Sequence, residues 1–539
     1  MTKKKTNSKL LIPPKNGLAV RMYRHGLGDC FLLAFDKSNS KTPCYVLIDC
    51  GVHMRQDKGS KRLGEVMTNL IGATGGKLDV VVVSHEHADH LSGFVQKGSP
   101  FINSRIEVDR FWVAWTEKVG DPQADRLRRK RGAARKIIQK AVEKIRKRGI
   151  AAFADQLTGL LDFESLATDT PLLGAKAKTK KRASSNEVAL EMLKQNADKV
   201  EYCEPGETLK LPGVRSTRAR VYVLGPPRDE VLLKRDKPAK GASRETYLAG
   251  RAEQRTFIQA PALHLGEKVG PRKDDLRHPF EWALRRECRF DVKGSSAPWR
   301  TRCPAPPEIR PFYRKNYFSA AKDWRRIDTE WLDTAEQLAL DLNNDTNNTS
   351  LTLAFELGTV KQGHVFLFVG DAQVGNWLSW RSQKYKANRR TSSADDLLAR
   401  TVLYKVGHHG SHNATVRRDP LHTSTDHPQG EPFGLELMPS GLTALIPVDQ
   451  AAVRKRMPTP WHMPHSPLYK RLLEKADRRV LRSDGLSPRS EGISLSSRLP
   501  RGSNATPAPG LDNVEWRRSS VKFTNGRKCQ LYYDLLFEP

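Results

Sequence analysis

A six-residue segment of this chain carries four side chains that commonly bind metal ions. Residues 85–90 read His-Glu-His-Ala-Asp-His and follow directly after an apolar stretch. Because alternate residues of an extended segment project to the same side, His85 and His87 can hold one ion. The chain must then bend so that Asp89 and His90 reach a second ion. Imidazole and carboxylate ligands without cysteine suit a catalytic zinc, manganese or iron site better than a purely structural zinc site.

Two later segments also place such side chains directly after apolar runs. Val369 and Gly370 lead to Asp371, whose carboxylate could bridge two ions, and the run at 403–406 leads to His408 and His409. Strand ends of this kind can meet at one edge of a sheet. Only one of the two adjacent histidines is expected to bind the second ion. We favour His409 as the ligand and His408 as a proton donor.

Other polar residues near these segments have expected roles of their own. We expect Asp49 to hold a ligand imidazole or the loop by hydrogen bonds, and a plain strand-end turn is the alternative. Asp89 would also orient the attacking hydroxide. Lys405 and Ser411 are candidate phosphate contacts, with a solvated lysine as the alternative at 405. His465 could close over the leaving group or could be an ordinary surface histidine.

The elements that must position these residues can be read from the apolar pattern. Short apolar runs separated by turn residues predict strands of a buried sheet, and apolar residues at helical spacing predict helices. The expected strands are 18–23, 30–35, 44–49, 78–83, 111–115, 220–224, 349–357, 364–369, 403–406, 443–446 and 530–537, and the expected helices are 63–70, 121–149 and 467–476.

Together these segments resemble the metallo-β-lactamase superfamily, and more closely the hydrolase domain of ComEC-type DNA-uptake competence proteins. The likeness covers 18–116, 200–227 and 345–486 in pieces. It implies an α/β fold, the metallo-β-lactamase αββα sandwich with basic insertions. It also implies two divalent metal ions, zinc or manganese, held by His85, His87, Asp89, His90, Asp371 and His409. The residues that match are Gly26, Gly28, Asp29, Asp49, Gly51, 85–90, Gly370, Asp371, Lys405, 408–411, Pro464, His465, Arg482 and Asp484.

One departure from the family pattern concerns the first ion. Many members supply a third histidine to it from a strand end that lies between the cluster and the Gly-Asp segment. Here the corresponding strand ends in Leu224, Gly225 and Pro226, so this ligand is missing. His264, within an insertion, is an alternative source. Without it, the first ion would be held more weakly, with water in the vacant position.

The charge of the chain points to polyanionic partners. Lys and Arg number 92 against 60 Asp and Glu, which gives a net charge of +32. Such an excess attracts polyanions, so we expect nucleic acid, with DNA favoured, as the partner. A generally basic protein without such a partner is the alternative, and a partner protein or a homo-oligomer is also open. Basic segments at 126–148, 178–182 and 228–310 could follow a phosphate backbone.

Aromatic residues interleave with these charges in the second insertion. They could stack on bases of a single strand, or they could form a small core of the insertion itself. They are Trp282, Trp299, Phe312, Tyr313, Tyr317, Phe318 and Trp324.

Compartment and domain boundaries follow from the remaining features. No apolar run approaches membrane-spanning length and the N-terminus lacks a signal peptide, so we expect a cytoplasmic protein without membrane contact. The seven cysteines are scattered without a CxxC pair, and we interpret Cys30, Cys44 and Cys50 as buried thiols.

The expected regions are a basic tail at 1–17, the core at 18–116, 200–227 and 341–486, basic insertions at 117–199 and 228–340, and a linker with a C-terminal strand at 487–539.

Three functions fit these observations, because a fold alone does not fix an activity. The first is a metal-dependent phosphodiesterase, specifically a DNase that uses a two-metal-activated water, with a role as a bacterial defence effector considered. The second is a small-molecule phosphodiester or ester hydrolase whose charge is incidental. The third is a non-catalytic nucleic-acid-binding protein, which the intact cluster and Asp371 make the least favoured.

Overall fold

The computed structural model describes a large part of the chain, and by their contacts the residues divide into two compact units. Unit 1 comprises 1–128, 162–252 and 343–539, and unit 2 comprises 129–161 and 253–342. The described residues are 10–38, 40–53, 56–147, 157–158, 184–236, 238, 246, 310–317, 330–359, 362–387, 390–455, 463–486, 515–522 and 528–538.

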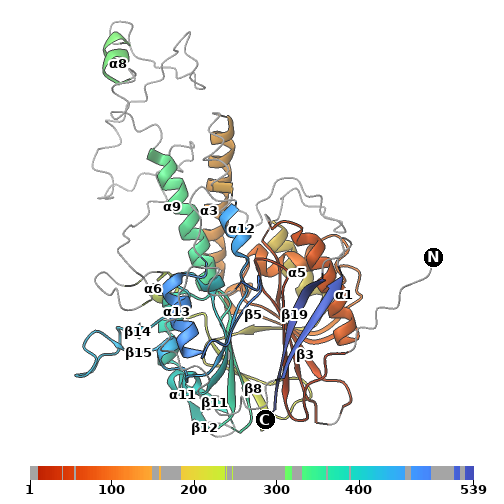
Figure 1. Ribbon diagram of the computed structural model, residues 1–539. Helices are drawn as coiled ribbons and strands as arrows, with labels where there is room; N and C mark the ends of the chain where they lie inside the picture. The colour runs from red at the N-terminus through yellow and green to blue at the C-terminus, as the bar shows by residue number, and fades with distance from the viewer. Residues whose placement is uncertain are drawn as a thin grey trace, which may run out of the picture. The chain divides into compact units, whose positions relative to one another are not determined.

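Unit 1 is built on two sheets (Figure 1). The first has eight strands in the order β18-β19-β1-β2-β3-β4-β5-β6, and the second has seven in the order β17-β16-β13-β10-β9-β8-β7. The strands of the first sheet, in that order, are Glu515–Lys522, Lys528–Phe537, Leu18–Tyr23, Cys30–Phe35, Cys44–Cys50, Lys77–Val83, Glu107–Ala114 and Ala197–Cys203. Those of the second are Val480–Arg482, Thr443–Ile446, Thr401–Lys405, His364–Phe368, Thr352–Leu357, Ala219–Gly225 and Thr208–Leu209.

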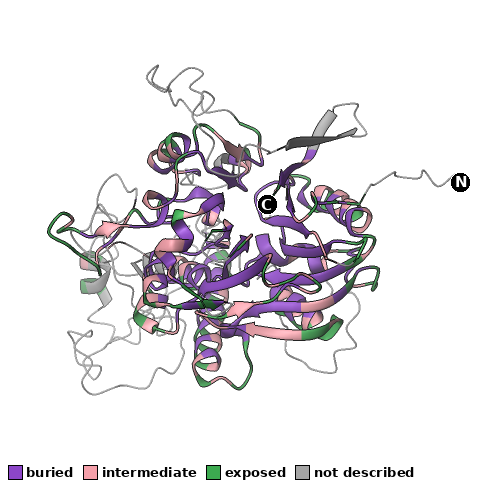
Figure 2. Ribbon diagram, turned by 90° about the horizontal axis from the view of Figure 1, so that it is seen from below, coloured by how far each residue is buried: buried purple, intermediate pink, exposed green. Residues whose placement is uncertain are grey.

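The central strands are buried along their whole length because both faces of each sheet are covered. Along β4, Val80 and Val82 lie in the core that also contains Phe355 of the other sheet. Val81 and Val83 lie in a separate core that contains the apolar residues of α1, α2 and α5. This alternation follows from the two-residue period of a strand. Figure 2 shows buried residues along many of the strands.

Helices pack on the outer face of each sheet. α1 (Gly59–Thr74), α2 (Ala88–Val95) and α5 (Ser185–Asn196) contribute to the core outside the first sheet. α10 (Val374–Leu378), α11 (Ala394–Ala399) and α13 (Ser466–Lys475) contribute to the core outside the second. Helix, sheet, sheet and helix therefore form four layers, and the prediction of an αββα sandwich is confirmed. Shorter elements of unit 1 are α6 (Glu230–Leu233), α12 (Gln450–Lys455) and the hairpins Tyr385–Ala387/Arg390–Ser392 and Arg418–Asp419/Glu431–Pro432.

Two segments that the sequence analysis placed outside the core belong to unit 1. α5 lies within the expected insertion 117–199, yet the buried amide of Asn186 donates to the carbonyl of Glu86 in the metal-binding segment, at 2.6 Å. The C-terminal strand β19 pairs with β1 in antiparallel register from Leu18 opposite Phe537. Arg21 of β1 and Asp534 of β19 lie opposite each other in this register and form a buried ion pair at 2.7 Å.

Unit 2 contains most of α3 (Pro122–Lys147), α8 (Arg310–Tyr317) and the larger part of α9 (Glu330–Asn348). Both α3 and α9 can be followed in Figure 1. The expected apolar stripe of α3 is buried, at Ile138, Ala141, Val142 and Ile145. The prediction of this helix is therefore confirmed within two residues of its expected ends.

Several predictions fall on residues that the structure does not describe. These include His264, the basic segment 178–182, most of 228–310, the linker at 487–509, and Trp282, Trp299, Phe318 and Trp324. Phe312, on α8, is described and is exposed. Within the described ranges, none of the helices combines the length and the apolarity needed to cross a bilayer. Cys30, Cys44 and Cys50 are buried free thiols, as expected.

Candidate metal centre

The candidate site lies where strands of both sheets end. β3 and β4 run parallel and lead to Asp49 and to the segment 84–90, while β10 and β13 run parallel and lead to Asp371 and to 408–409. Parallel strands end at the same edge of a sheet, so the side chains that follow them meet there. Asp29 precedes β2, which is antiparallel to β3, and it therefore reaches the same edge.

Glycines allow the loops to approach closely enough to form the site. A Cβ atom at Gly51 would overlap the backbone of Asp89 and His90, in the first turn of α2. Gly370 has a φ of 53°, and a Cβ there would lie 2.7 Å from Cβ of Ser84. His409 itself has a φ of 50°, a conformation that costs energy for a residue other than glycine. The close approach of the loops therefore limits which residues fit at positions 51 and 370 and fixes the backbone conformation of His409.

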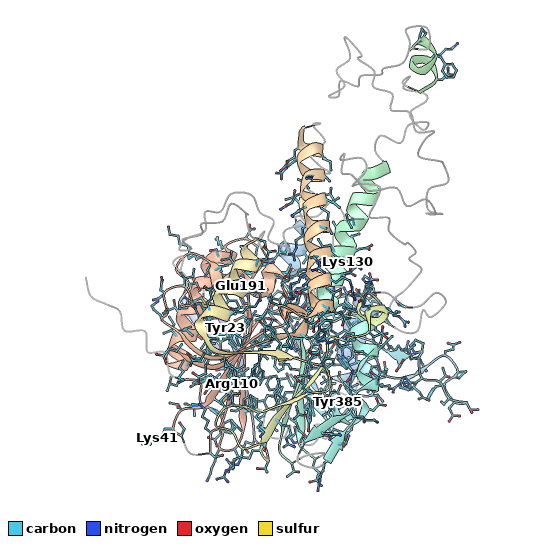
Figure 3. All side chains as sticks on the ribbon, turned by 180° about the vertical axis from the view of Figure 1, so that it is seen from behind. Tyr23, Lys41, Arg110, Lys130, Glu191 and Tyr385 are labelled. Atoms are coloured by element: carbon cyan, nitrogen blue, oxygen red, sulfur yellow. The ribbon has the colours of Figure 1, made fainter. Side chains whose placement is uncertain are left out.

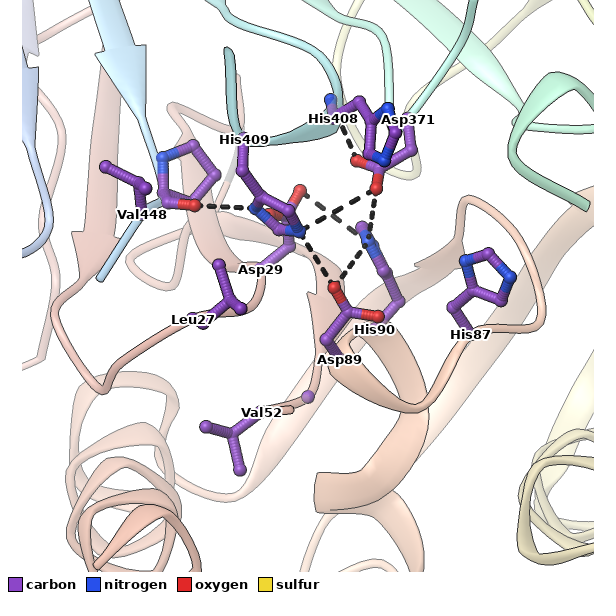
Figure 4. A network of polar contacts seen from close by, with 12 residues as sticks. Leu27, Asp29, Val52, His87, Asp89, His90, Asp371, His408, His409 and Val448 are labelled. Carbon is purple, nitrogen blue, oxygen red and sulfur yellow. Dashed lines mark hydrogen bonds and ion pairs between the residues drawn. The ribbon is translucent and has the colours of Figure 1, made fainter. Parts of the chain in front are cut away.

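Four of the predicted ligands form one group, which we call the four-ligand group: Asp89, His90, Asp371 and His409. Their ligand atoms all lie within 4.8 Å of one another, and all four residues are buried. His409 Nε2 lies 2.8 Å from Asp89 Oδ2 and 3.8 Å from Asp371 Oδ2. His90 Nε2 lies 3.4 Å from Asp371 Oδ2 and 3.7 Å from Asp89 Oδ2. Figure 4 shows the four side chains pointing toward a common centre.

Two atoms of this group have no hydrogen-bond partner although they are buried. They are Asp89 Oδ1 and His90 Nε2. Buried polar atoms are almost always paired, so each exception calls for an explanation. Two imidazoles and two carboxylates are ligands that zinc and manganese accept. The residues of the four-ligand group therefore fit a divalent ion.

The residues behind the group fix the orientation of His90. Its Nδ1 lies 2.8 Å from Asp49 Oδ2, so a proton on Nδ1 is donated to this carboxylate and Nε2 is left facing the group. Asp49 also accepts from the backbone N and the Oγ of Ser84, at 2.7 Å each. Asp49 thus contacts a ligand imidazole in the way that an orienting role requires.

Lys405 lies beneath the group with its side chain 1% exposed. Its Nζ lies 2.5 Å from Asp29 Oδ2 and 3.4 Å from Asp371 Oδ1, and it donates to the carbonyl of Gly370 at 2.7 Å. An ammonium group has three donors, and these three oxygens can use all of them. This geometry favours a role in positioning Asp371 over the phosphate contact expected from the sequence. Asp29, which the sequence suggested only through its turn motif, is the missed member of this arrangement.

Opposite charges shift the ionisation of the buried groups strongly. Burial lowers the pKa of His90, but the carboxylates of Asp371, Asp49 and Asp89 outweigh burial and raise this pKa well above its usual value. Burial raises the pKa of Asp371, but His90, His409 and Lys405 outweigh it and hold this pKa well below its usual range. The carboxylate of Asp371 therefore stays ionised and attracts cations.

His85 and His87 do not join the four-ligand group. His85 Nε2 lies 2.9 Å from His87 Nδ1, and His85 Nδ1 faces the hydroxyls of Ser84 and Ser350 at 3.0 and 3.3 Å. In Figure 4 the ring of His87 lies apart from the other ligands. We call these two residues the His85–His87 pair. Among the described residues, no third His, Cys, Asp or Glu completes a group with this pair.

His408 stands at the edge of the centre and makes neutral contacts. Its Nε2 lies 3.2 Å from the Asn347 amide nitrogen and its Nδ1 lies 2.7 Å from Ser411 Oγ, which donates to Asn413. Burial lowers the pKa of His408 to about 4. A histidine that is neutral near pH 7 and has both ring nitrogens engaged does not favour the expected proton donation. Ser411 is buried and takes part in this hydrogen-bond network. The sequence analysis missed the asparagines of the network, and the Asn-rich run at 343–348 was the signal that could have indicated them.

The remaining predicted residue, His465, lies at the start of α13. Its backbone N donates to the carbonyl of Gly410 at 2.7 Å, and its ring lies 6.3 Å from that of His412. The residue is partly exposed. It therefore borders the loop that carries His408 and His409 without belonging to the four-ligand group.

Comparisons with known proteins relate one part of the chain to a known superfamily. Residues 30–175 match the family model of the metallo-beta-lactamase superfamily, which includes the segment 85–90. This region of the chain is therefore similar to that superfamily. A solved structure, a beta-lactamase domain protein from Burkholderia ambifaria, is similar at 16% identity with a TM-score of 0.19, over 38% of this chain and 44% of that chain. The match spans less than half of that protein's length. No curated protein matches the chain.

Proposed function

We propose that this protein is a metal-dependent phosphodiesterase that cleaves nucleic acid, with DNA as its preferred substrate. The observation that carries the proposal is the four-ligand group with its two buried atoms that make no hydrogen bond, Asp89 Oδ1 and His90 Nε2. A divalent ion held there would supply a water of lowered pKa and a positive charge for attack on phosphorus. The superfamily is mostly hydrolases, and the likeness to ComEC-type hydrolase domains supports DNA as the polymer.

The protein's own residues prepare this chemistry. Asp49 keeps the Nδ1 proton of His90 engaged, so that Nε2 faces the centre. Lys405 and the backbone N of His408 hold Asp371 Oδ1, at 3.4 and 3.0 Å, and leave its Oδ2 toward the ligand imidazoles. A carboxylate and an imidazole fixed in this way need no rearrangement when a substrate arrives.

Charge supports nucleic acid as the substrate. A diester polymer is held by cations spread over several phosphates, and the chain has a net charge of +32. On α3, exposed cationic residues recur at helical spacing, at Arg126, Arg129, Lys130, Lys136 and Lys140. Lys130 is labelled on this helix in Figure 3. A defence role against foreign DNA would use such a nuclease, and the cytoplasm is where we expect it to act.

The test compares a ligand variant with a surface variant. The purified protein is incubated with Mn²⁺ or Zn²⁺ and plasmid, single-stranded DNA, RNA or bis-p-nitrophenyl phosphate. We expect polymer cleavage that Asp89→Ala loses and that Glu191→Ala, on the outer side of α5, retains. Turnover of the small ester without polymer cleavage would instead indicate a small-molecule hydrolase. DNA retention without any turnover would indicate a non-catalytic binding protein.

Electrostatic contact with the polymer is tested in the same assay. Arg129→Ala/Lys136→Ala removes two exposed cations from α3, and Glu143→Ala is the matched control on the same helix. Each lost phosphate contact should lower the salt slope of DNA binding by about 1. Hydrolysis of the small ester should be the same in all three proteins. An unchanged salt slope would remove α3 from the binding surface.

A further inference from the structure

The metal-binding residues fall into two sets of unequal completeness. The four-ligand group has four buried protein ligands, whereas the His85–His87 pair has two. We propose that the resting protein holds one tightly bound divalent ion, in the four-ligand group, and that the His85–His87 pair does not retain a second. This inference deepens the proposed function, because it concerns the ion on which the proposed hydrolysis depends.

The His85–His87 pair lacks the ligands that a retained ion needs. Catalytic zinc sites use three protein ligands and keep one position open. The two facing nitrogens, His85 Nε2 and His87 Nδ1, lie 2.9 Å apart. Across the described residues, no ligand atom of a third His, Cys, Asp or Glu lies within 4.8 Å of both. An ion at this pair would therefore depend on water for most of its ligands.

The end of β8 could have supplied the third ligand, but the packing of Asn376 against Gly225 leaves no room for a side chain there. A Cβ atom at Gly225, the last residue of β8, would lie 2.8 Å from Cγ of Asn376. The Asn376 amide is fully used there: its nitrogen donates to the carbonyls of Asn348 and Ser350, at 3.1 and 2.9 Å, and its oxygen accepts from Trp380 at 3.0 Å. A side chain at position 225 would displace this saturated amide. The absence of the third histidine is thus built into the packing of α10 against β8.

The buried atoms that make no hydrogen bond belong to the other set of ligands. Asp89 Oδ1 and His90 Nε2 both belong to the four-ligand group. Both nitrogens of His85 have neighbours within hydrogen-bond distance. Losing a residue that merely orients a ligand costs about 10–100-fold in metal affinity, so lacking two whole ligands should cost at least about 100-fold. The metal affinities of the four-ligand group and of the His85–His87 pair should therefore differ clearly when a chelator competes for the ion.

The experiment counts ions rather than products. The full-length protein is dialysed against buffered Zn²⁺ or Mn²⁺, passed over a desalting column, and measured by elemental analysis and native mass spectrometry. We expect one ion per chain in the wild type and in His85→Ala/His87→Ala. We expect a loss of at least about 100-fold in affinity in His409→Ala and in Asp89→Asn. Circular dichroism shows whether each variant is folded, and Asp89→Asn, which preserves volume, covers the case in which His409→Ala is not.

Two outcomes would overturn the inference. One is two ions of similar affinity in the wild type with one in His85→Ala/His87→Ala. The other is two ions in the wild type with one in His264→Ala, which would assign the third ligand to that histidine. Because the ion count needs no substrate, a protein that binds one ion but cleaves no polymer supports this inference and removes the nuclease proposal. A protein that cleaves nucleic acid and binds two ions tightly would support the nuclease proposal and overturn this inference.

Discussion

Two clusters of buried charge lie at opposite ends of the second sheet, and they differ in how their carboxylates are paired. One cluster surrounds Glu356, near the end of β9 that points away from the metal centre, and there the buried atom without a hydrogen-bond partner is a donor, Arg220 Nε. Glu356 is fully buried, and its two oxygens accept from Arg220 at 3.0 Å, Tyr222 at 2.6 Å and Arg400 at 2.5 Å. Arg400 also pairs with Asp396 at 3.0 Å. Two carboxylates thus face two guanidinium groups.

The cluster at the metal centre is not balanced in this way. Four carboxylates, those of Asp29, Asp49, Asp89 and Asp371, gather around one ammonium group and two imidazoles. Asp29 Oδ1, Asp89 Oδ1 and His90 Nε2 have no hydrogen-bond partner. Burying charge is costly in both places, but only at the Glu356 cluster do partners within the protein take up both oxygens of its central carboxylate. The comparison indicates that open ligand atoms, rather than buried charge alone, mark the functional site.

The largest effect that this comparison predicts is on stability. Glu356→Ala leaves Arg220 and Arg400 buried without their shared carboxylate, and breaking a buried pair on one side costs about 3–5 kcal/mol. We expect this loss in the free energy of unfolding measured with urea. The metal content per folded chain should stay at the wild-type level. A variant that loses metal while keeping its stability would reverse the assignment of the two clusters.

Four of the six predicted ligands meet in the structure, and the sequence could place them because they are contiguous or follow apolar runs. Residues 85–90 are contiguous, and the strands before Asp371 and His409 are apolar on both faces, so that their ends could be located. The ends of buried parallel strands meet at one edge, and this geometry brings the segments together without any knowledge of side-chain contacts.

The parts that the sequence did not predict depend on contacts between distant residues. β6 is an edge strand with mostly half-exposed and exposed residues, so it lacks the apolar signal of its neighbours. The amide of Asn186 supports the loop at Glu86 across 100 positions of sequence. Lys405 was read as a phosphate contact because its partner Asp29 lies far from it in sequence. The closure of Gly225 by Asn376 is likewise visible only in the packing.

A second prediction probes the open cluster without removing a ligand. In Asp49→Asn an amide nitrogen can face His90 Nδ1, which would then have to accept, and the proton would move to Nε2, where it blocks the ligand lone pair. We expect metal affinity to fall by about 10–100-fold, the usual cost of losing an orienting carboxylate. Asp79→Asn is the matched control, because Asp79 is a buried carboxylate on the neighbouring strand β4 that pairs with Lys37 at 2.5 Å. This control should lose stability and keep its metal. Equal metal affinities in the two variants would contradict an orienting role for Asp49.

The smallest predicted effect is a pH dependence of stability that comes from His25, a buried histidine outside the four-ligand group. His25 is fully buried, its Nε2 lies 2.6 Å from the carbonyl of Gly51, and burial lowers its pKa to about 4. Between pH 6.5 and pH 4 the unfolded chain binds a proton at this residue and the folded chain does not, so stability falls as the pH falls through this window. From pH 6.5 to pH 5 this amounts to about 2 kcal/mol. His25→Gln can still donate to Gly51 but cannot be protonated. Urea unfolding of the metal-free proteins at pH 6.5 and pH 5 should therefore show a smaller loss in the variant, and equal losses would mean that His25 is already charged in the folded protein.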